Sequence, residues 1–213
     1  MSTALYFSPQ PTRSRRAHWA FLEAEADFVP HEVDIFAGEQ NEPAYRALNP
    51  MGHVPTATFD SQAVSESAAL ALIVCSEAKD LVPPSGTAAW RAALQWVIFA
   101  PAELDPQLAT LNAHRLLRPL AERIASVAAQ AEEAWIQRAQ RLEATLTGQP
   151  FLLGESFGVA DICVGHSVVW AKMHDLLPAG SVLQTYLDKL QARPAFQKVY
   201  GGPIEVYPDP HAG

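Results

Sequence analysis

Cysteine is scarce in this sequence: Cys75 and Cys163 are the two cysteines among 213 residues. Two cysteines exclude a disulfide-dense scaffold, and these two form neither a C-x-x-C pair nor another metal-ligand spacing. The seven histidines are scattered and no H-E-x-x-H occurs, so we expect no metal site. This cysteine usage is typical of a reducing compartment, most simply the cytoplasm.

Positive charge and long apolar runs are also scarce. The chain has 15 Lys and Arg against 23 Asp and Glu, a net charge of −8, which argues against a nucleic-acid binder and against docking on an anionic membrane. The longest apolar run, Ala68 to Cys75, is far shorter than the about 20 residues of a membrane span. The first 25 residues lack the apolar core of a signal peptide, so we expect none.

Apolar residues make up 49% of the chain and charged residues 18%, which is enough to bury a core. The first 80 residues alternate strand-like and helix-like patterns, which favours a sheet with helices packed on it. Ser14 and Ser65 are candidate N-caps for two of the helices. We expect strands at residues 4–8, 28–35, 55–60 and 63–65, and helices at 14–26, 42–48 and 66–78.

The rest of the chain has helical patterns alone. Residues 79–88 are rich in Pro, Gly, Ser and Thr and form the best candidate linker. We therefore expect an α/β domain over residues 1–80 and an all-helical domain over residues 89–213. The expected helices of the second domain are 90–100, 127–146, 159–173 and 186–193.

The most specific segment is the run N-P-M-G-H-V-P-T over residues 49–56, followed by S-E-S-A over residues 65–68. The Val54–Pro55 bond is a candidate cis peptide that leaves the Val54 N–H and C=O free to face a ligand. At a helix start, the Ser67 hydroxyl and backbone N–H groups form a site for a carboxylate, and Glu66 can pair with an ammonium. The alternative for residues 65–66 is a plain helix cap and first-turn acid.

These segments resemble the glutathione S-transferase family. The resemblance includes the Asn49–Pro55 run, the Glu66–Ser67 pair, the R-S-R-R start of the first helix, and F-L-L-G-E-S-F-G-V-A-D over residues 151–161. It implies a thioredoxin-like N-terminal domain, a helical-bundle C-terminal domain, a homodimer, and glutathione as co-substrate.

The resemblance also assigns a role to each residue of the expected glutathione site. Val54 would bind the cysteinyl backbone beside a cis Pro55, and Glu66 with Ser67 would hold the γ-glutamyl end. His53 would lie near the glycine carboxylate, although a solvated turn residue is the alternative for His53.

The chemistry implied by the resemblance is activation of the glutathione thiol. Its pKa of roughly 8.5 leaves little thiolate at neutral pH, so a hydroxyl and a helix N-terminus must stabilise the thiolate. Ser14 is the first candidate for this hydroxyl and Thr12 the second, with Ser8 and Tyr6 also open. A plain N-cap is the alternative for Ser14.

Three arginines, Arg13, Arg15 and Arg16, start the first helix. They are candidates to attract an anionic substrate or glutathione itself, or else they are solvated surface residues. The family segment that precedes the core helix usually has Ser or Thr three residues before its Asp161, and here that position is Gly158. No cysteine lies near the first helix, so cysteine-based disulfide exchange has no nucleophile there.

The resemblance predicts a detoxifying glutathione transferase that acts on a small, largely apolar electrophile. Alternatives are a non-catalytic binding or regulatory protein, and a glutathione-dependent isomerase or dehalogenase. Residues 207–211 are a candidate cover for the site. The candidate electrophile pocket consists of Trp96, Phe99, His114 and Trp170, for which simple helical core is the alternative reading.

Overall fold

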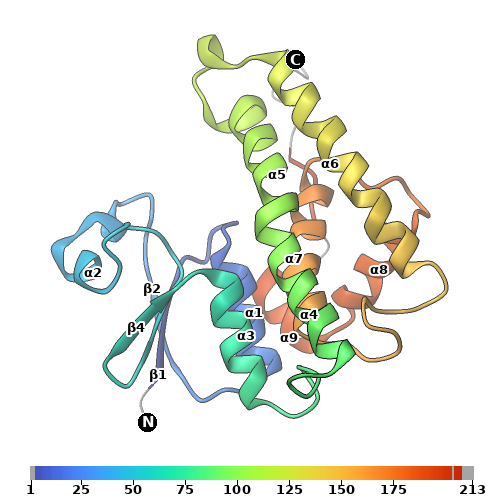
Figure 1. The fold of residues 1–213 in the computed structure, drawn as a ribbon. Helices are drawn as coiled ribbons and strands as arrows, with labels where there is room; N and C mark the ends of the chain where they lie inside the picture. The colour runs from blue at the N-terminus through green and yellow to red at the C-terminus, as the bar shows by residue number, and fades with distance from the viewer. Residues whose placement is uncertain (1–2, 203, 208–213) are drawn as a thin grey trace.

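The computed structural model describes residues 3–202 and 204–207, so most of the expected cover at 207–211 lies outside the described residues. The N-terminal part is a four-stranded sheet of order β2-β1-β3-β4, in which β1 and β2 are parallel and the other pairs antiparallel. The expected order of strands and helices is confirmed (Figure 1). The elements are β1 (Thr3–Phe7), α1 (Ser14–Glu23), β2 (Val29–Glu32), α2 (Pro43–Leu48), β3 (Thr56–Phe59), β4 (Gln62–Ser65) and α3 (Ser67–Glu77).

The described chain after residue 77 is helical, as expected. Two helices were not predicted, α5 and α9, and both have a proline in their first turn, where a missing N–H is tolerated. No helix among the described residues has the length and hydrophobicity needed to cross a bilayer. The helices are α4 (Ala88–Phe99), α5 (Asp105–Asn112), α6 (Ala125–Leu146), α7 (Val159–Met173), α8 (Val182–Gln191) and α9 (Pro194–Tyr200), with π-helical turns at Ala100–Leu104 and Ala113–Leu117.

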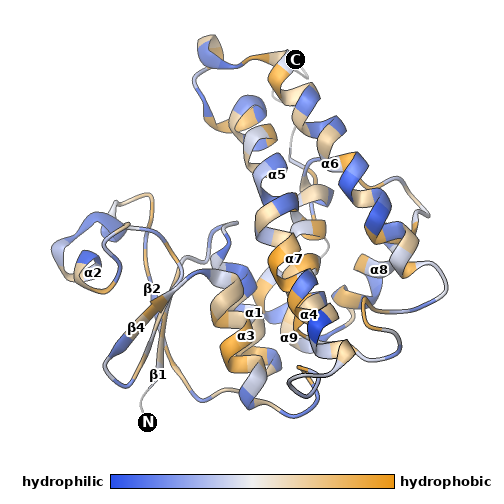
Figure 2. Ribbon diagram, in the orientation of Figure 1, coloured by the Kyte–Doolittle hydropathy of each residue, from blue (hydrophilic) through white to orange (hydrophobic). Residues whose placement is uncertain are grey.

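Helices α1 and α3 lie between the sheet and the later helices (Figure 1). Strand β1 turns Leu5 and Phe7 into the core, because side chains alternate along a strand. Helix α3 is apolar on nearly every side, since it has the sheet on one side and α7 on the other. Figure 2 shows this contrast: α3 is largely hydrophobic, whereas α2 and much of α6 carry hydrophilic residues. The division between domains near residues 80–89 stays a prediction.

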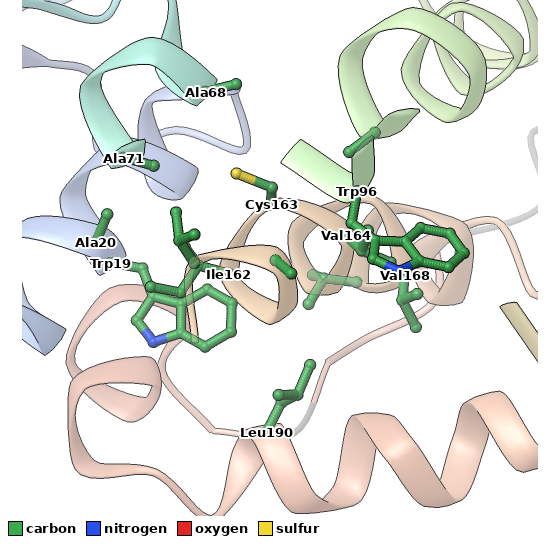
Figure 3. Packing of buried hydrophobic residues seen from close by; sticks show 14 of the residues in the cluster. Trp19, Ala20, Ala68, Ala71, Trp96, Ile162, Cys163, Val164, Val168 and Leu190 are labelled. Carbon is green, nitrogen blue, oxygen red and sulfur yellow. The ribbon is translucent and has the colours of Figure 1, made fainter. Parts of the chain in front are cut away.

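The core where the two parts meet contains Trp19 of α1 and Ile162 and Cys163 of α7 (Figure 3). Helix α7 approaches α1 closely at Gly165, where an added Cβ would lie 3.2 Å from the Trp19 ring and 2.6 Å from Leu190. Burial raises the pKa of the Cys163 thiol to about 12. Cys163 therefore contributes packing rather than thiolate chemistry.

The start of α7 depends on Asp161. Its carboxylate accepts hydrogen bonds from the N–H groups of Leu152 (2.9 Å) and Gly158 (3.0 Å) and from the Tyr186 hydroxyl (2.9 Å). The missing Ser or Thr at position 158 has a steric reason, because a Cβ there would lie 2.7 Å from the carbonyl oxygen of Leu81. That carbonyl also accepts the N–H of Val159 at 2.9 Å.

We expect Gly158→Ala to lower the free energy of unfolding by about 1–3 kcal/mol, because the new methyl group overlaps a backbone oxygen that cannot rotate away. The matched control is Gly202→Ala, since an added Cβ at Gly202 meets no atom within 4 Å. Urea unfolding followed by circular dichroism measures both changes. Equal midpoints for the two variants would contradict the steric explanation.

Candidate functional site

A cavity of about 280 Å³ lies between the loops of the N-terminal part and helices α7 and α9. One side is formed by the turn before α1 and by the 49–55 loop. The other side is formed by one face of α7 and by the end of α9. The lining residues are Pro11, Thr12, Arg13, Arg15, Ile35, Gln40, Gly52, His53, Val54, His166, Val169, Trp170, Met173 and Tyr200.

The 49–55 loop is held in place by buried polar side chains. The Asn49 side-chain amide donates to the His53 carbonyl at 2.7 Å, and the Tyr45 hydroxyl donates to the same oxygen at 2.7 Å. Gly52 has a φ of +64°, a left-handed conformation that favours glycine. These contacts explain why the run needs Asn and Gly at these two positions.

The Val54–Pro55 peptide is cis, as its sequence context indicated. Val54 lines the cavity, and no hydrogen-bond partner for its N–H or C=O occurs among the described residues. The main chain of Val54 is therefore available to pair with an extended peptide ligand. The exposed side chain of His53 lies beside it on the cavity lining.

Among the hydroxyl candidates, Thr12 lies on the cavity lining and Ser14 does not. Ser14 is fully buried, and its Oγ accepts the N–H of Ser8 at 3.2 Å. The N-cap prediction for Ser14 is wrong, because Arg13 is the N-cap residue and Ser14 is the first residue of α1. The Ser14 N–H instead donates to Thr12 Oγ1 at 3.2 Å, which places the Thr12 oxygen at the positive end of α1.

The other two candidates lie away from the cavity lining. Tyr6 stacks on His31 with ring centroids 4.6 Å apart and also contacts Tyr45. This places Tyr6 on the opposite face of the sheet from Leu5, because side chains alternate along β1. Ser8 is buried, and its hydroxyl oxygen accepts the N–H of Gln10.

The start of α3 presents Glu66 and Ser67 together. Glu66, rather than the predicted Ser65, is the N-cap residue, and it has a φ of 74°. Ser67 is buried, and its Oγ accepts a hydrogen bond from Nη1 of Arg16 at 3.0 Å. An arginine has no acceptor, so the Ser67 proton stays available to donate to a carboxylate. Neither Glu66 nor Ser67 lines the 280 Å³ cavity itself.

Arg16 is fully buried rather than a surface residue. Its Nη2 lies 2.8 Å from a carboxylate oxygen of Asp105, and its Nε donates to the Cys163 carbonyl at 3.2 Å. The Ser167 hydroxyl donates to the same carboxylate at 2.6 Å. Burial alone would raise the pKa of Asp105, but the charge of Arg16, the influence of His166 and the hydrogen bonds from Ser167 and Arg16 together hold that pKa below its usual value.

Sequence reasoning missed this buried network. The one available signal was the position of Arg16. The helical pattern of α1 places Arg16 on the side that faces the core, together with Ala17 and Ala20. Its partner, Asp105, lies 89 positions away in the chain, and no local motif connects the two. The pairing therefore became visible only in the folded chain.

The helical side of the cavity combines aromatic rings with a neutral histidine. Nδ1 of His166 and the Tyr200 hydroxyl are 2.9 Å apart. Burial, followed by repulsion from Arg16, lowers the pKa of His166 to about 3, so its ring is uncharged at neutral pH. Trp170 lines the cavity one helical turn further along α7.

Three residues of the predicted electrophile pocket do not line this cavity. Trp96 is buried in the core against Phe99, with ring centroids 5.4 Å apart. His114 lies in a different depression, and its Nδ1 accepts the N–H of Ile124 at 3.1 Å. The helical pattern did not reveal which face of α4, or of the π-helical turn at Ala113–Leu117, turns toward the N-terminal part. In the described part of the chain, no group of three His, Cys, Asp or Glu side chains has a metal-binding arrangement.

Comparison with known proteins agrees with this geometry. The family model for the glutathione S-transferase N-terminal domain matches residues 12–77. Glutathione S-transferase 3 of Zea mays is 29% identical over 207 residues, covering 91% of each chain. The disulfide-bond oxidoreductase YfcG of Escherichia coli K12 is 27% identical over 201 residues, covering 90% of this chain and 91% of YfcG.

The chain is also similar to a glutathione S-transferase of known structure. The theta class glutathione S-transferase of Xanthomonas axonopodis pv. citri, crystallised with glutathione bound, superimposes with a TM-score of 0.83 at 26% identity. The match covers 95% of this chain and 99% of that one. The architecture is a thioredoxin-like domain followed by a helical domain. Over residues 12–77 the chain matches the glutathione S-transferase N-terminal domain, and over nearly its whole length it is similar to members of the glutathione S-transferase family.

We expect Asp105→Asn to lower the free energy of unfolding by about 3–5 kcal/mol at neutral pH, because it leaves the buried Arg16 without its counter-charge. The folded pKa of Asp105 is lowered. Its ionised form therefore stabilises the fold above the unfolded pKa of about 3.9, and this contribution is lost as the pH falls through the folded pKa.

Chemical denaturation at several pH values tests this expectation. The gap between wild type and Asp105→Asn should narrow below about pH 4. The double variant Arg16→Met/Asp105→Leu is the control, and it should be more stable than Asp105→Asn because it leaves no buried charge unpaired. A gap that stays constant with pH would contradict the role assigned to the charge.

Proposed function

We propose that this protein is a glutathione transferase that stabilises the glutathione thiolate for attack on a small, largely apolar electrophile. The observation that carries the proposal is the shared cavity. Val54 and Thr12 lie on one side, and Val169, Trp170 and Tyr200 form the other. A thiol and an apolar acceptor bound on opposite sides would meet within one cavity.

We propose Thr12 as the hydroxyl that stabilises the thiolate, ahead of Ser14. Thr12 Oγ1 accepts the N–H of Ser14, so its own proton remains available to donate to sulfur. The same hydroxyl lies at the N-terminal end of α1, where the helix dipole favours a negative charge. A donor in this position would raise the thiolate fraction at neutral pH. Ser14, in contrast, is enclosed and would support the turn that carries Thr12.

The two ends of glutathione would be bound at separate places. The Ser67 hydroxyl and the first N–H groups of α3 would bind the γ-glutamyl carboxylate, and the exposed Glu66 carboxylate would pair with the ammonium. His53 would lie nearest the glycine carboxylate. This assignment follows the family resemblance, and the hydrogen bond from Arg16 to Ser67 supports it by fixing the serine oxygen as an acceptor.

A homodimer, a cytoplasmic location and a detoxifying role remain expectations drawn from the resemblance and from composition. Isomerase, dehalogenase and non-catalytic binding are alternatives that use the same glutathione site. Disulfide chemistry by a cysteine of this chain has no support, because Cys75 and Cys163 are both buried and burial raises the pKa of each.

The proposed role of Thr12 predicts a split between rate and affinity. We expect Thr12→Val to lower kcat for 1-chloro-2,4-dinitrobenzene about a hundredfold, because one donor to a developing charge is removed. Calorimetric affinity for glutathione should change less than about threefold. Thr12→Ser is the matched control and should retain most of the rate. A loss of kcat in Ser14→Ala with an active Thr12→Val would assign the role to Ser14 instead.

The proposed glutathione site predicts the opposite split. We expect Ser67→Ala to weaken glutathione binding about tenfold or more, because a hydrogen bond to a charged group is lost. Glu66→Gln should weaken binding by a similar amount through loss of the ammonium partner. Isothermal titration with glutathione measures both, and Glu77→Gln at the far end of α3 is the control. Unchanged affinity in both variants would remove this assignment.

A further inference from the structure

The cavity is positively charged although the chain carries a net charge of −8. Its lining includes Arg13 and Arg15 and contains no aspartate or glutamate among the described residues. Neither arginine lies within salt-bridge distance of a carboxylate in the described part of the chain, whereas Arg115, Arg138 and Arg193 each do. The two cavity arginines are therefore cations that the described residues leave uncompensated.

Arg15 is the better placed of the two. Its Nη2 and Nε donate to the Pro9 carbonyl at 3.1 and 3.4 Å, and its guanidinium lies 5.7 Å from the centroid of the Tyr200 ring. These contacts hold the side chain against the cavity and leave further N–H groups without an acceptor among the residues described. Arg13 is exposed, so water screens its charge.

The side of the cavity opposite the 49–55 loop is suited to an aromatic ring. Val169, Trp170 and Met173 lie on one face of α7 at three- and four-residue spacing, and Tyr200 of α9 completes this surface. Aromatic rings and the methionine thioether bind planar apolar groups well. The half-buried guanidinium of Arg15 lies at the edge of this surface through its contact with Tyr200.

Resting on the proposed function, we propose that the electrophile is an aromatic anion and that Arg15 binds its carboxylate. The two carboxylates of glutathione have other places in the proposed site, beside Ser67 and beside His53. Arg15 would then act as a specificity-determining residue for the acceptor. A planar guanidinium matches a carboxylate geometrically, and the pair is strongest where water is partly excluded. Burial lowers the pKa of Arg15 from its usual value, which agrees with a partly desolvated cation.

The first test measures binding without reaction. Isothermal titration compares 3,5-dinitrobenzoate with its methyl ester, on protein saturated with S-methylglutathione, which has no free thiol. We expect the acid to bind about tenfold more tightly than the ester, the size of one hydrogen bond to a charged group. Because this comparison uses the unchanged protein, it remains decisive even if a variant fails to fold.

The second test uses variants. Arg15→Gln should weaken binding of the acid about tenfold and change that of the ester less than twofold, and Arg15→Lys should keep part of the preference. Arg91→Gln is the matched control, because Arg91 also donates to a loop carbonyl, that of Gly86 at 2.8 Å, and lies outside the cavity lining. Equal binding of acid and ester would overturn the proposal. A loss of S-methylglutathione affinity in Arg15→Gln would overturn it too, and would assign Arg15 to glutathione.

A separate assay tests the proposed function. With 4-chloro-3,5-dinitrobenzoate, the glutathione thiol releases its proton to solvent and its sulfur forms a bond to the ring carbon. The carbon–chlorine bond then breaks, and chloride leaves with the bonding electron pair. Chloride release measures this reaction. Selective binding of the acid without enzymatic chloride release would count against the transferase function while supporting the Arg15 assignment. Enzymatic chloride release without preferential binding of the acid would support the transferase function and count against the Arg15 assignment.

Discussion

The buried ion pair between Arg16 and Asp105 is the interaction on which the rest of the structure depends. Through Arg16 it joins α1 to the start of α3 at Ser67, to α5 at Asp105, and to α7 at Cys163 and Ser167. A buried charge is tolerated only where its partners are complete. The relative positions of these four helices are therefore constrained together, and with them both sides of the cavity.

This constraint explains how a cavity forms between two parts of different architecture. The N-terminal part supplies backbone groups at Val54 and a hydroxyl at Thr12, and both are suited to a peptide-like thiol. The helical part supplies a rigid surface of aromatic and apolar side chains. Nδ1 of His166 and the Tyr200 hydroxyl lie within hydrogen-bond distance of each other there, and the His166 ring is uncharged at neutral pH. The positive charge comes from Arg15 in the first turn of α1. Its guanidinium contacts the Pro9 carbonyl in the N-terminal part and the Tyr200 ring in the helical part.

Much of the N-terminal part was predictable because its signals are local. Alternating strand and helix patterns predicted the element order, and the 49–56 run predicted the cis peptide before β3. The predictions failed at helix ends. Ser14 and Ser65 are suitable N-caps by residue type, but the chain begins α1 with Arg13 and α3 with Glu66 as the capping residues. The helix start at Glu66 has a left-handed φ that residue type alone does not indicate.

The sequence by itself determined the fold class, the glutathione transferase resemblance and the segments that contribute to the site, because these depend on short spacings along the chain. Only the tertiary structure decided which side chains face the cavity. Thr12 and Ser14 are two residues apart, yet one lies on the lining and the other is enclosed. Trp96 and Trp170 both lie on apolar helices, yet only Trp170 reaches the cavity. Such choices depend on how each helix is rotated against its neighbours, and that rotation is set by contacts between residues far apart in sequence, such as Arg16 and Asp105.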